Sequence, residues 1–102
     1  MPGFFEQARK AMEMRNQMKR LQREIEEMTK EYENGGVRVV VTGDMVVKSI
    51  EIADKSLLDP AKEEKLLRTF SENVNKALTL AKTEAQQRMQ AVTKELGLGG
   101  LG

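Results

Sequence analysis

Six basic side chains and only two acidic ones occupy residues 6–23, and this excess is the feature of the chain best suited to binding chemistry. Four of the six cations are arginines, whose planar guanidinium groups bind phosphate through paired hydrogen bonds. The only carboxylates that could pair with them inside this segment are those of Glu6 and Glu13. The segment therefore predicts a contact with phosphate groups. Its cations are Arg9, Lys10, Arg15, Lys19, Arg20 and Arg23.

Five of these cations share one side of a helical wheel. With Arg9 at zero they occupy an arc from roughly 240° to roughly 20°, whereas the apolar positions cluster near roughly 150°. The five extend about 21 Å along the helix axis, a span that meets several phosphates on one side of a duplex. The alternative is an ordinary solvated helix face. The five are Arg9, Arg15, Lys19, Arg20 and Arg23.

The following segment and the second helix carry a different charge pattern. Residues 24–33 hold five glutamates and one lysine, so the basic end of the first helix adjoins an acidic end. Residues 76–94 hold four cations against Glu84 alone, but a spacing of six residues distributes them around the helix. These cations are weaker candidates for the same contact. They are Lys76, Lys82, Arg88 and Lys94.

Other kinds of chemistry find no support in the composition. The chain has no Cys and no His, which excludes disulfides, thiol nucleophiles, imidazole acid–base catalysis and zinc sites built from those ligands. Asn34-Gly35-Gly36 precedes a strand-like run and lacks both phosphate-loop patterns, so it predicts a turn and no nucleotide site. We therefore expect no enzyme activity, no cofactor, no metal and no small-molecule substrate.

The elements that position the basic residues begin with a long amphipathic helix. Apolar residues recur at steps of three and four over residues 4–32, which predicts a coiled-coil-like helix about 40 Å long. They are Phe4, Ala11, Met14, Met18, Leu21, Ile25, Met28 and Tyr32. The first strand of a meander is expected around residues 29–33, so helix and strand compete for that segment.

Two β-branched runs, residues 37–42 and 45–52, predict the other strands. Asn34-Gly35 suits the two positive-φ positions of the turn before them. A two-residue turn at Gly43-Asp44 pairs Val41 with Val46, Val39 with Lys48 and Val37 with Ile50, and this face is the expected core. The opposite face carries an apolar strip within a polar surface.

A second helix is expected from Asp59 as N-cap and Pro60 as first residue to a stop at Gly97. At about 55 Å it is longer than the sheet it covers, so its second half must meet another helix or project. The chain of 102 residues is expected to form one domain over residues 1–96, with a flexible Gly/Leu tail at 97–102. Without a membrane-spanning stretch or signal-type segment, a soluble cytoplasmic protein with no membrane partner is expected.

This order of elements resembles the YbaB/EbfC family of bacterial nucleoid-associated proteins along nearly the whole chain. The resemblance is carried by residues 12–22 of the first helix, the strand and turn at 36–43, residues 47–52 leading to Leu57-Leu58, and Asn75-Lys76-Ala77. This sequence lacks the Gly/Met-rich extension that commonly precedes the first helix.

The resemblance implies a homodimer that joins through the sheet and second helix, with helical arms arranged like tweezers. It implies binding of double-stranded DNA in the nucleoid with low sequence specificity, a role in nucleoid organisation and gene regulation, and no catalysis. The DNA-binding role is carried over to Arg9, Lys10, Arg15, Lys19, Arg20, Arg23, Lys82 and Arg88. The alternative is a prefoldin-like coiled-coil chaperone or protein-interaction module, which also presents helix tips to its partner.

Overall fold

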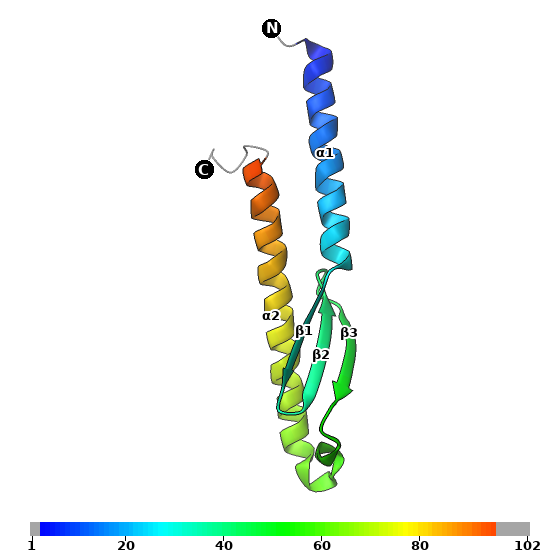
Figure 1. The fold of residues 1–102 in the computed structure, drawn as a ribbon, viewed down its shortest axis with the longest axis vertical. Coiled ribbons are helices and arrows are strands. Elements are labelled where there is room, and N and C mark those ends of the chain that lie inside the picture. The colour runs from blue at the N-terminus through cyan, green and yellow to red at the C-terminus, as the bar shows by residue number, and fades with distance from the viewer. Residues whose placement is uncertain (1–2, 96–102) are drawn as a thin grey trace.

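A computed structural model describes residues 3–95 as a helix, a three-stranded antiparallel meander and a second long helix (Figure 1). This α-β-β-β-α order confirms the predicted α+β fold class. The predicted tail, residues 97–102, and the predicted domain end at residue 96 lie outside the described residues. The elements are α1 (Phe4–Glu27), β1 (Thr29–Asn34), β2 (Val37–Thr42), β3 (Val47–Ile52), the 3-10 turns η1 (Lys55–Leu58) and η2 (Pro60–Lys62), and α2 (Glu63–Glu95).

The chain passes from α1 to β1 through a single residue, Met28, whose backbone is already extended. A helix reaching Tyr32 was therefore the wrong alternative, and the strand predicted around residues 29–33 is confirmed. Strand pairing decides the competition, because Thr29–Asn34 lies opposite Val37–Thr42 residue by residue and Tyr32 packs against the core. This short junction holds the start of the sheet against the end of the helix.

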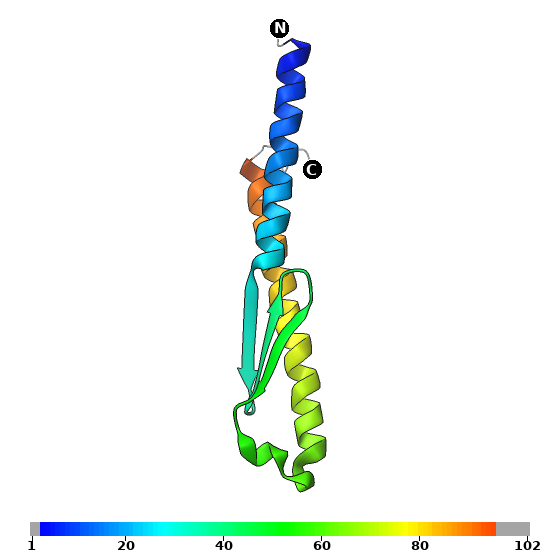
Figure 2. The same cartoon turned by 90° about the vertical axis from the view of Figure 1, so that its right-hand side faces the viewer.

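The core lies between the central strand and α2. Val37, Val39 and Val41 alternate along β2 and are fully buried, as are Ala77 and Ala81 on the helix. The small alanine side chains let the helix backbone approach the β-branched strand closely, which makes a thin, dense core. Figure 2 shows the strands and α2 running side by side along the lower half of the molecule.

The turn between β1 and β2 falls one residue later than predicted. Its two positive-φ residues are Gly35 and Gly36, at 62° and 86°, so Asn34 closes β1 by pairing with Val37. The buried side chain of Asn73 on α2 donates from Nδ2 to the carbonyls of Asn34 and Val37 at 2.8 and 2.9 Å. The helix thus satisfies the carbonyl groups on both sides of the turn.

The predicted register of the β2–β3 hairpin is wrong by two residues over most of its length. Val39 pairs with Ile50 and Val37 with Ile52, while Val46 is exposed in the loop. The cause is a longer turn: the Val46 carbonyl accepts from Thr42 N–H at 2.8 Å, and Met45 adopts a positive φ of 67°. A bulge in β3 opposite Val40 and Val41 takes up one residue of the shift, while Val37, Val39 and Val41 alternate along β2 and face the core.

The predicted caps at the start of the second helix are found in a modified form. The Asp59 carboxylate accepts from Ala61 N–H at 3.0 Å, but it caps η2, and the α-helix begins three residues later at Glu63. The 33 residues of α2 extend about 50 Å, well beyond strands of six residues. Neither described helix is long and apolar enough to cross a membrane.

The two helices give the molecule an elongated shape of 74 × 23 × 14 Å. α1 leaves the sheet in line with β1, and the second half of α2 runs beside it, as both views show. The outer part of α1 continues beyond Glu95, the last described residue of α2 (Figure 1). We call α1 the arm.

Candidate nucleic-acid interface

The side of the arm that faces α2 is the apolar side. Leu21 and Ile25 are buried, and each lines a hollow between the helices, of about 260 and about 440 Å³ respectively. Farther out along the arm, Met14 and Met18 are half-buried, and Ala11 and Phe4 are exposed. Burial of the predicted apolar positions therefore fades toward the tip of the arm, where α2 no longer accompanies it.

The five cations predicted to share a helix side are all exposed in the structure. Because Leu21 and Ile25 point to α2, the regular twist of the helix directs the middle of the predicted arc to the opposite side. Arg20 is at the margin of the arc, since it lines the smaller hollow together with Val92 and Glu95. We call this set the basic face: Arg9, Arg15, Lys19, Arg20 and Arg23.

No cation of the basic face forms an ion pair with any residue among 3–95. Arg38 on β2 shows the contrasting arrangement, because its guanidinium donates a hydrogen bond to the Glu31 carboxylate on β1 and its other terminal nitrogen lies 3.5 Å from Glu51 Oε2 on β3. The hydrogen bond and negative charge of Glu31 are the main reason that the pKa of Arg38 is raised above its usual value. The sheet neutralises its arginine, whereas the arm leaves its cations free to meet an external anion.

Lys10 lies apart from the basic face. It lines a small hollow with Glu13, Met14 and Gln17, on the side of the arm that continues the apolar positions. Its side chain is exposed and therefore available for binding, but it projects from a different side of the helix than Arg9 does. The structure therefore brings five of the six predicted cations of α1 together and separates the sixth.

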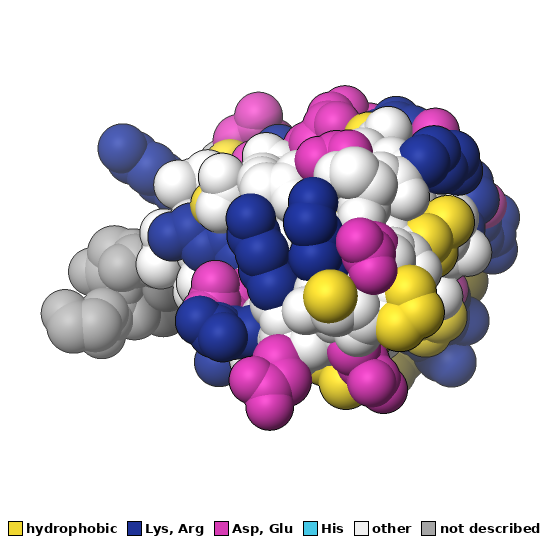
Figure 3. Space-filling model, turned by 90° about the horizontal axis from the view of Figure 1, so that it is seen from below, with side chains coloured by type: hydrophobic (Ala, Val, Ile, Leu, Met, Phe, Trp, Pro, Cys, Tyr) yellow, Lys and Arg dark blue, Asp and Glu magenta, His cyan; other side chains and the backbone are white. Residues whose placement is uncertain are grey.

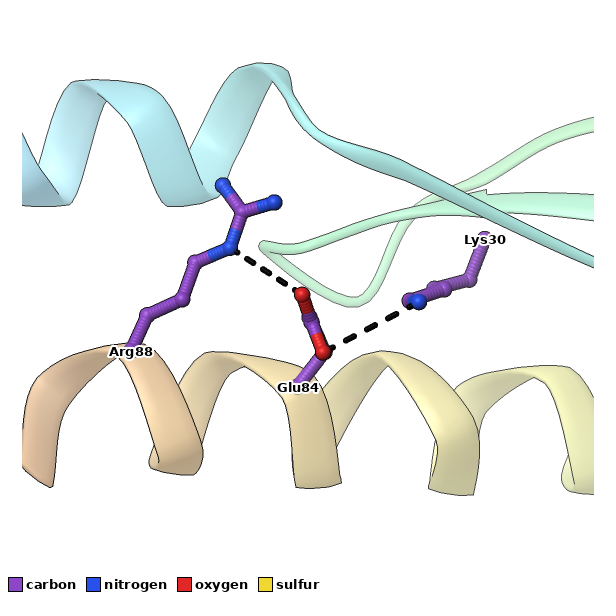
Figure 4. A network of polar contacts seen from close by, with 3 residues as sticks. All are labelled: Lys30, Glu84 and Arg88. Carbon is purple, nitrogen blue, oxygen red and sulfur yellow. Dashed lines mark hydrogen bonds and ion pairs between the residues drawn. The ribbon is translucent and has the colours of Figure 1, made fainter. Parts of the chain in front are cut away.

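The two candidate cations of α2 sit among carboxylates. Lys82 lines the larger hollow between the helices, together with Glu26 and Asp44. Arg88 donates from Nε to Glu84 Oε1 at 3.3 Å, and the other oxygen of Glu84 lies 3.8 Å from Lys30 Nζ on β1 (Figure 4). The spacing of four residues between Glu84 and Arg88 was a sequence signal for this pair. Arg88 is therefore paired with a carboxylate, unlike the cations of the basic face, whereas Lys82 shares a hollow with two carboxylates without forming an ion pair among the described residues.

Glu84→Gln is expected to raise affinity for an anionic ligand of Arg88 by a few-fold. The substitution removes the charge that competes for the guanidinium, and an exposed or half-exposed pair is worth up to about 1 kcal/mol, or roughly fivefold. Binding of a duplex DNA measured by fluorescence anisotropy tests this. Glu72→Gln, an exposed change of equal charge on the same helix, is the control. An equal gain from Glu84→Gln in an Arg88→Gln background would show that the pair has no role.

The end of the molecule opposite the arm has no comparable charge excess. Figure 3 looks onto this end and shows basic and acidic side chains intermixed. Residues 54–68, which include η1, η2 and the first turn of α2, contain four basic and four acidic residues. Across the described residues, no group of three carboxylates gathers to form a cation site. The largest excess of positive charge thus lies on residues 6–23 of the arm, which hold six basic and two acidic residues.

Sequence reasoning missed two features that matter for this surface. Phe4 was assigned to the apolar side of the helix, yet it and Phe5 are 81% and 86% exposed. Gly43, in the turn before β3, is buried against the backbone of Ile25 at the base of the arm. The seven-residue spacing of Phe5, Met12 and Lys19, which places Phe5 on the basic side of the helix, was a signal for the exposed apolar tip. No local pattern in the sequence predicts that Gly43 lies against Ile25.

Known proteins match this sequence along nearly its whole length. The sequence model of the YbaB/EbfC DNA-binding family matches residues 1–96. The chain is 32% identical to a nucleoid-associated protein of Afipia carboxidovorans, covering 100% of this chain and 98% of that protein. It is 35% identical to a nucleoid-associated protein of Nitrobacter hamburgensis, with the same coverage, and 35% identical to one of Bradyrhizobium sp., covering 96% and 93%. Because these matches span the arm, the sheet and α2 together, the chain belongs to the YbaB/EbfC DNA-binding family.

Proposed function

We propose that this protein binds double-stranded DNA in the bacterial nucleoid, and that the basic face of the arm contacts the phosphate backbone. The observation that carries the proposal is the concentration of five exposed, unpaired cations on one side of a projecting helix. Family membership and the nucleoid-associated relatives support DNA as the ligand.

Phosphate contacts position a protein on DNA but read no base sequence. The basic face spans about 21 Å, and duplex DNA carries one charge per about 1.7 Å of its axis, so several phosphates lie within reach of one arm. A helix whose arginines and lysines contact only phosphates leaves the base edges unread. We infer that binding has low sequence specificity, consistent with a role in organising the nucleoid and in gene regulation.

We also propose that the protein acts as a homodimer. Exposed apolar side chains gather on and around the third strand, which is an open edge of the sheet: Met45, Val46, Val47 and Ile50 are 37–52% exposed. A second copy would cover this edge and present a second arm, doubling the number of phosphate contacts. Sedimentation equilibrium without DNA tests the proposal, and a monomer mass at micromolar concentration would contradict it.

Titration of a duplex at two salt concentrations tests the DNA-binding function. With five phosphate contacts by one arm, the affinity is expected to fall by roughly two to three orders of magnitude between about 50 and about 200 mM salt. Binding that is absent at low salt, or indifferent to salt, would contradict the proposal. Suppression of aggregation of an unfolded client protein, without DNA binding, would favour the prefoldin-like alternative.

A further inference from the structure

Three large apolar side chains near the tip of the arm lie in solvent. Phe4 and Phe5 are 81% and 86% exposed and Met12 is 64% exposed. The two phenyl rings stand edge to face, with their centroids 6.2 Å apart and their planes at 75°. A protein forfeits the free energy of burial when it leaves two phenylalanines in water, so this tip is suited to contact with another molecule.

The apolar tip is continuous with the basic face. Phe5 and Met12 line a hollow of about 420 Å³ together with Glu6, Ala8 and Arg9, and Arg9 is the outermost cation of the basic face. Phe5, Met12 and Lys19 follow one another at intervals of seven residues, which places them in one row along the helix. A ligand that lies along the basic face therefore reaches the phenyl rings as well.

We propose, on the basis of the DNA contact proposed above, that Phe4 and Phe5 form an apolar wedge that enters the minor groove and partly unstacks a base step. Architectural proteins insert Phe, Leu, Ile or Met between base pairs in this way and kink the duplex. The wedge adds to the proposed function a deformation of the DNA, with a preference for steps that unstack readily. Pyrimidine–purine steps such as TA have that property.

The position of the nearest cation supports DNA as the occupant. Arg9 follows Phe5 by four residues, or about 6 Å along the helix axis, and the minor groove is about 6 Å wide. A ring in the groove therefore leaves the Arg9 guanidinium beside the phosphates at its border. Two arm tips packed on each other would bring together Arg9 and Lys10 of both copies, beside Glu6 and Glu13 of each copy, so their charges neither favour nor oppose that contact. The cations that continue along the basic face from Arg15 to Arg23, with no carboxylate among residues 14–23, favour the anionic ligand.

The test compares the full-length protein with a Phe4→Ala/Phe5→Ala variant on a duplex of about 30 base pairs with central TA steps. Energy transfer between dyes at the two ends reports bending, and 2-aminopurine at the TA steps reports unstacking. The unaltered protein is expected to kink the duplex by about 20–90° and to raise 2-aminopurine fluorescence. The variant is expected to lose both signals while the salt dependence of its affinity stays unchanged. A Phe4→Leu/Phe5→Leu variant, which keeps an apolar wedge, is expected to recover them.

Gln7→Ala, an exposed change in the same turn of the arm, is the matched control and is expected to bend DNA normally. Equal bending by the Phe4→Ala/Phe5→Ala variant would overturn the wedge, as would salt-dependent binding by the unaltered protein without any distortion. The second result leaves the phosphate contact intact, whereas absence of binding removes both proposals. Two other results, each with unchanged DNA distortion, would also overturn the wedge. A lower oligomer mass of the Phe4→Ala/Phe5→Ala variant in sedimentation would assign the tip to contact with another copy. Loss of binding to phosphatidylglycerol vesicles by that variant would assign the tip to lipid.

Discussion

Replacing Arg15 and Arg23 with glutamate is expected to lower affinity for duplex DNA by at least about 100-fold at low salt. Each arginine removed costs one charge-assisted contact of about 1.5 kcal/mol, and the pair therefore costs about 3 kcal/mol, or two factors of ten. The new carboxylates add repulsion from the phosphates, which makes this figure a lower bound. Both residues are exposed and unpaired among the described residues, so helix content and oligomeric mass should not change.

The matched control is Lys65→Glu with Arg68→Glu, a double reversal at exposed positions near the start of α2, where the surrounding charges are balanced. This variant has the same net charge as the arm variant, so an equal loss of binding would mean that overall charge is responsible. The slope of log affinity against log salt concentration further distinguishes a loss of specific phosphate contacts from an effect of overall charge. It should become shallower by about 2 per engaged arm in the arm variant and stay constant in the control.

The elements of the fold were predictable because their signals are local. Periods of three and four specify α1 and α2, alternating valines specify β2, and Asp59-Pro60 marks the start of the second helical segment. The register of β3 was not predictable, because Thr42 and Met45 form a longer turn whose bulge depends on hydrogen bonds across the hairpin. The role of Asn73 was hidden for the same reason: its partners lie 36 and 39 residues away.

The composition of the basic face was also a local property, since helical twist alone gathers Arg9, Arg15, Lys19 and Arg23 on one side. Sequence spacing could not show which other cations were neutralised through space. Lys30 pairs with Glu84 across the sheet–helix interface, and Lys82 shares a hollow with Glu26 and Asp44 because α1 and the β2–β3 turn pack against α2. The division between free and compensated cations is therefore a consequence of tertiary structure.

Gly43 packs against the base of the arm, and Gly43→Ala is expected to destabilise the fold by about 3 kcal/mol, the upper end of the usual cost of overpacking. A Cβ at this position would lie 1.8 Å from the carbonyl oxygen of Ile25 and 2.7 Å from its carbonyl carbon. These are backbone atoms in the last turn of α1, so no side-chain rotation relieves the clash. The Gly43 N–H also donates to the Met28 carbonyl at 3.1 Å, and separation of the two segments breaks that bond.

Thermal unfolding followed by circular dichroism measures the loss of stability. In a chain of this size each kcal/mol lowers the melting temperature by roughly 4–8 °C, so the melting temperature is expected to fall by more than about 10 °C. Gly3→Ala is the control, because a Cβ there meets nothing within 4 Å, and its effect should stay below about 1 kcal/mol. Below its melting temperature, the Gly43→Ala protein should bind DNA more weakly although every cation of the basic face is present, since its arm leaves the sheet at a changed angle. A stable variant with unchanged affinity would mean that the arm's position is set elsewhere, and that the junction at Met28 is free to bend.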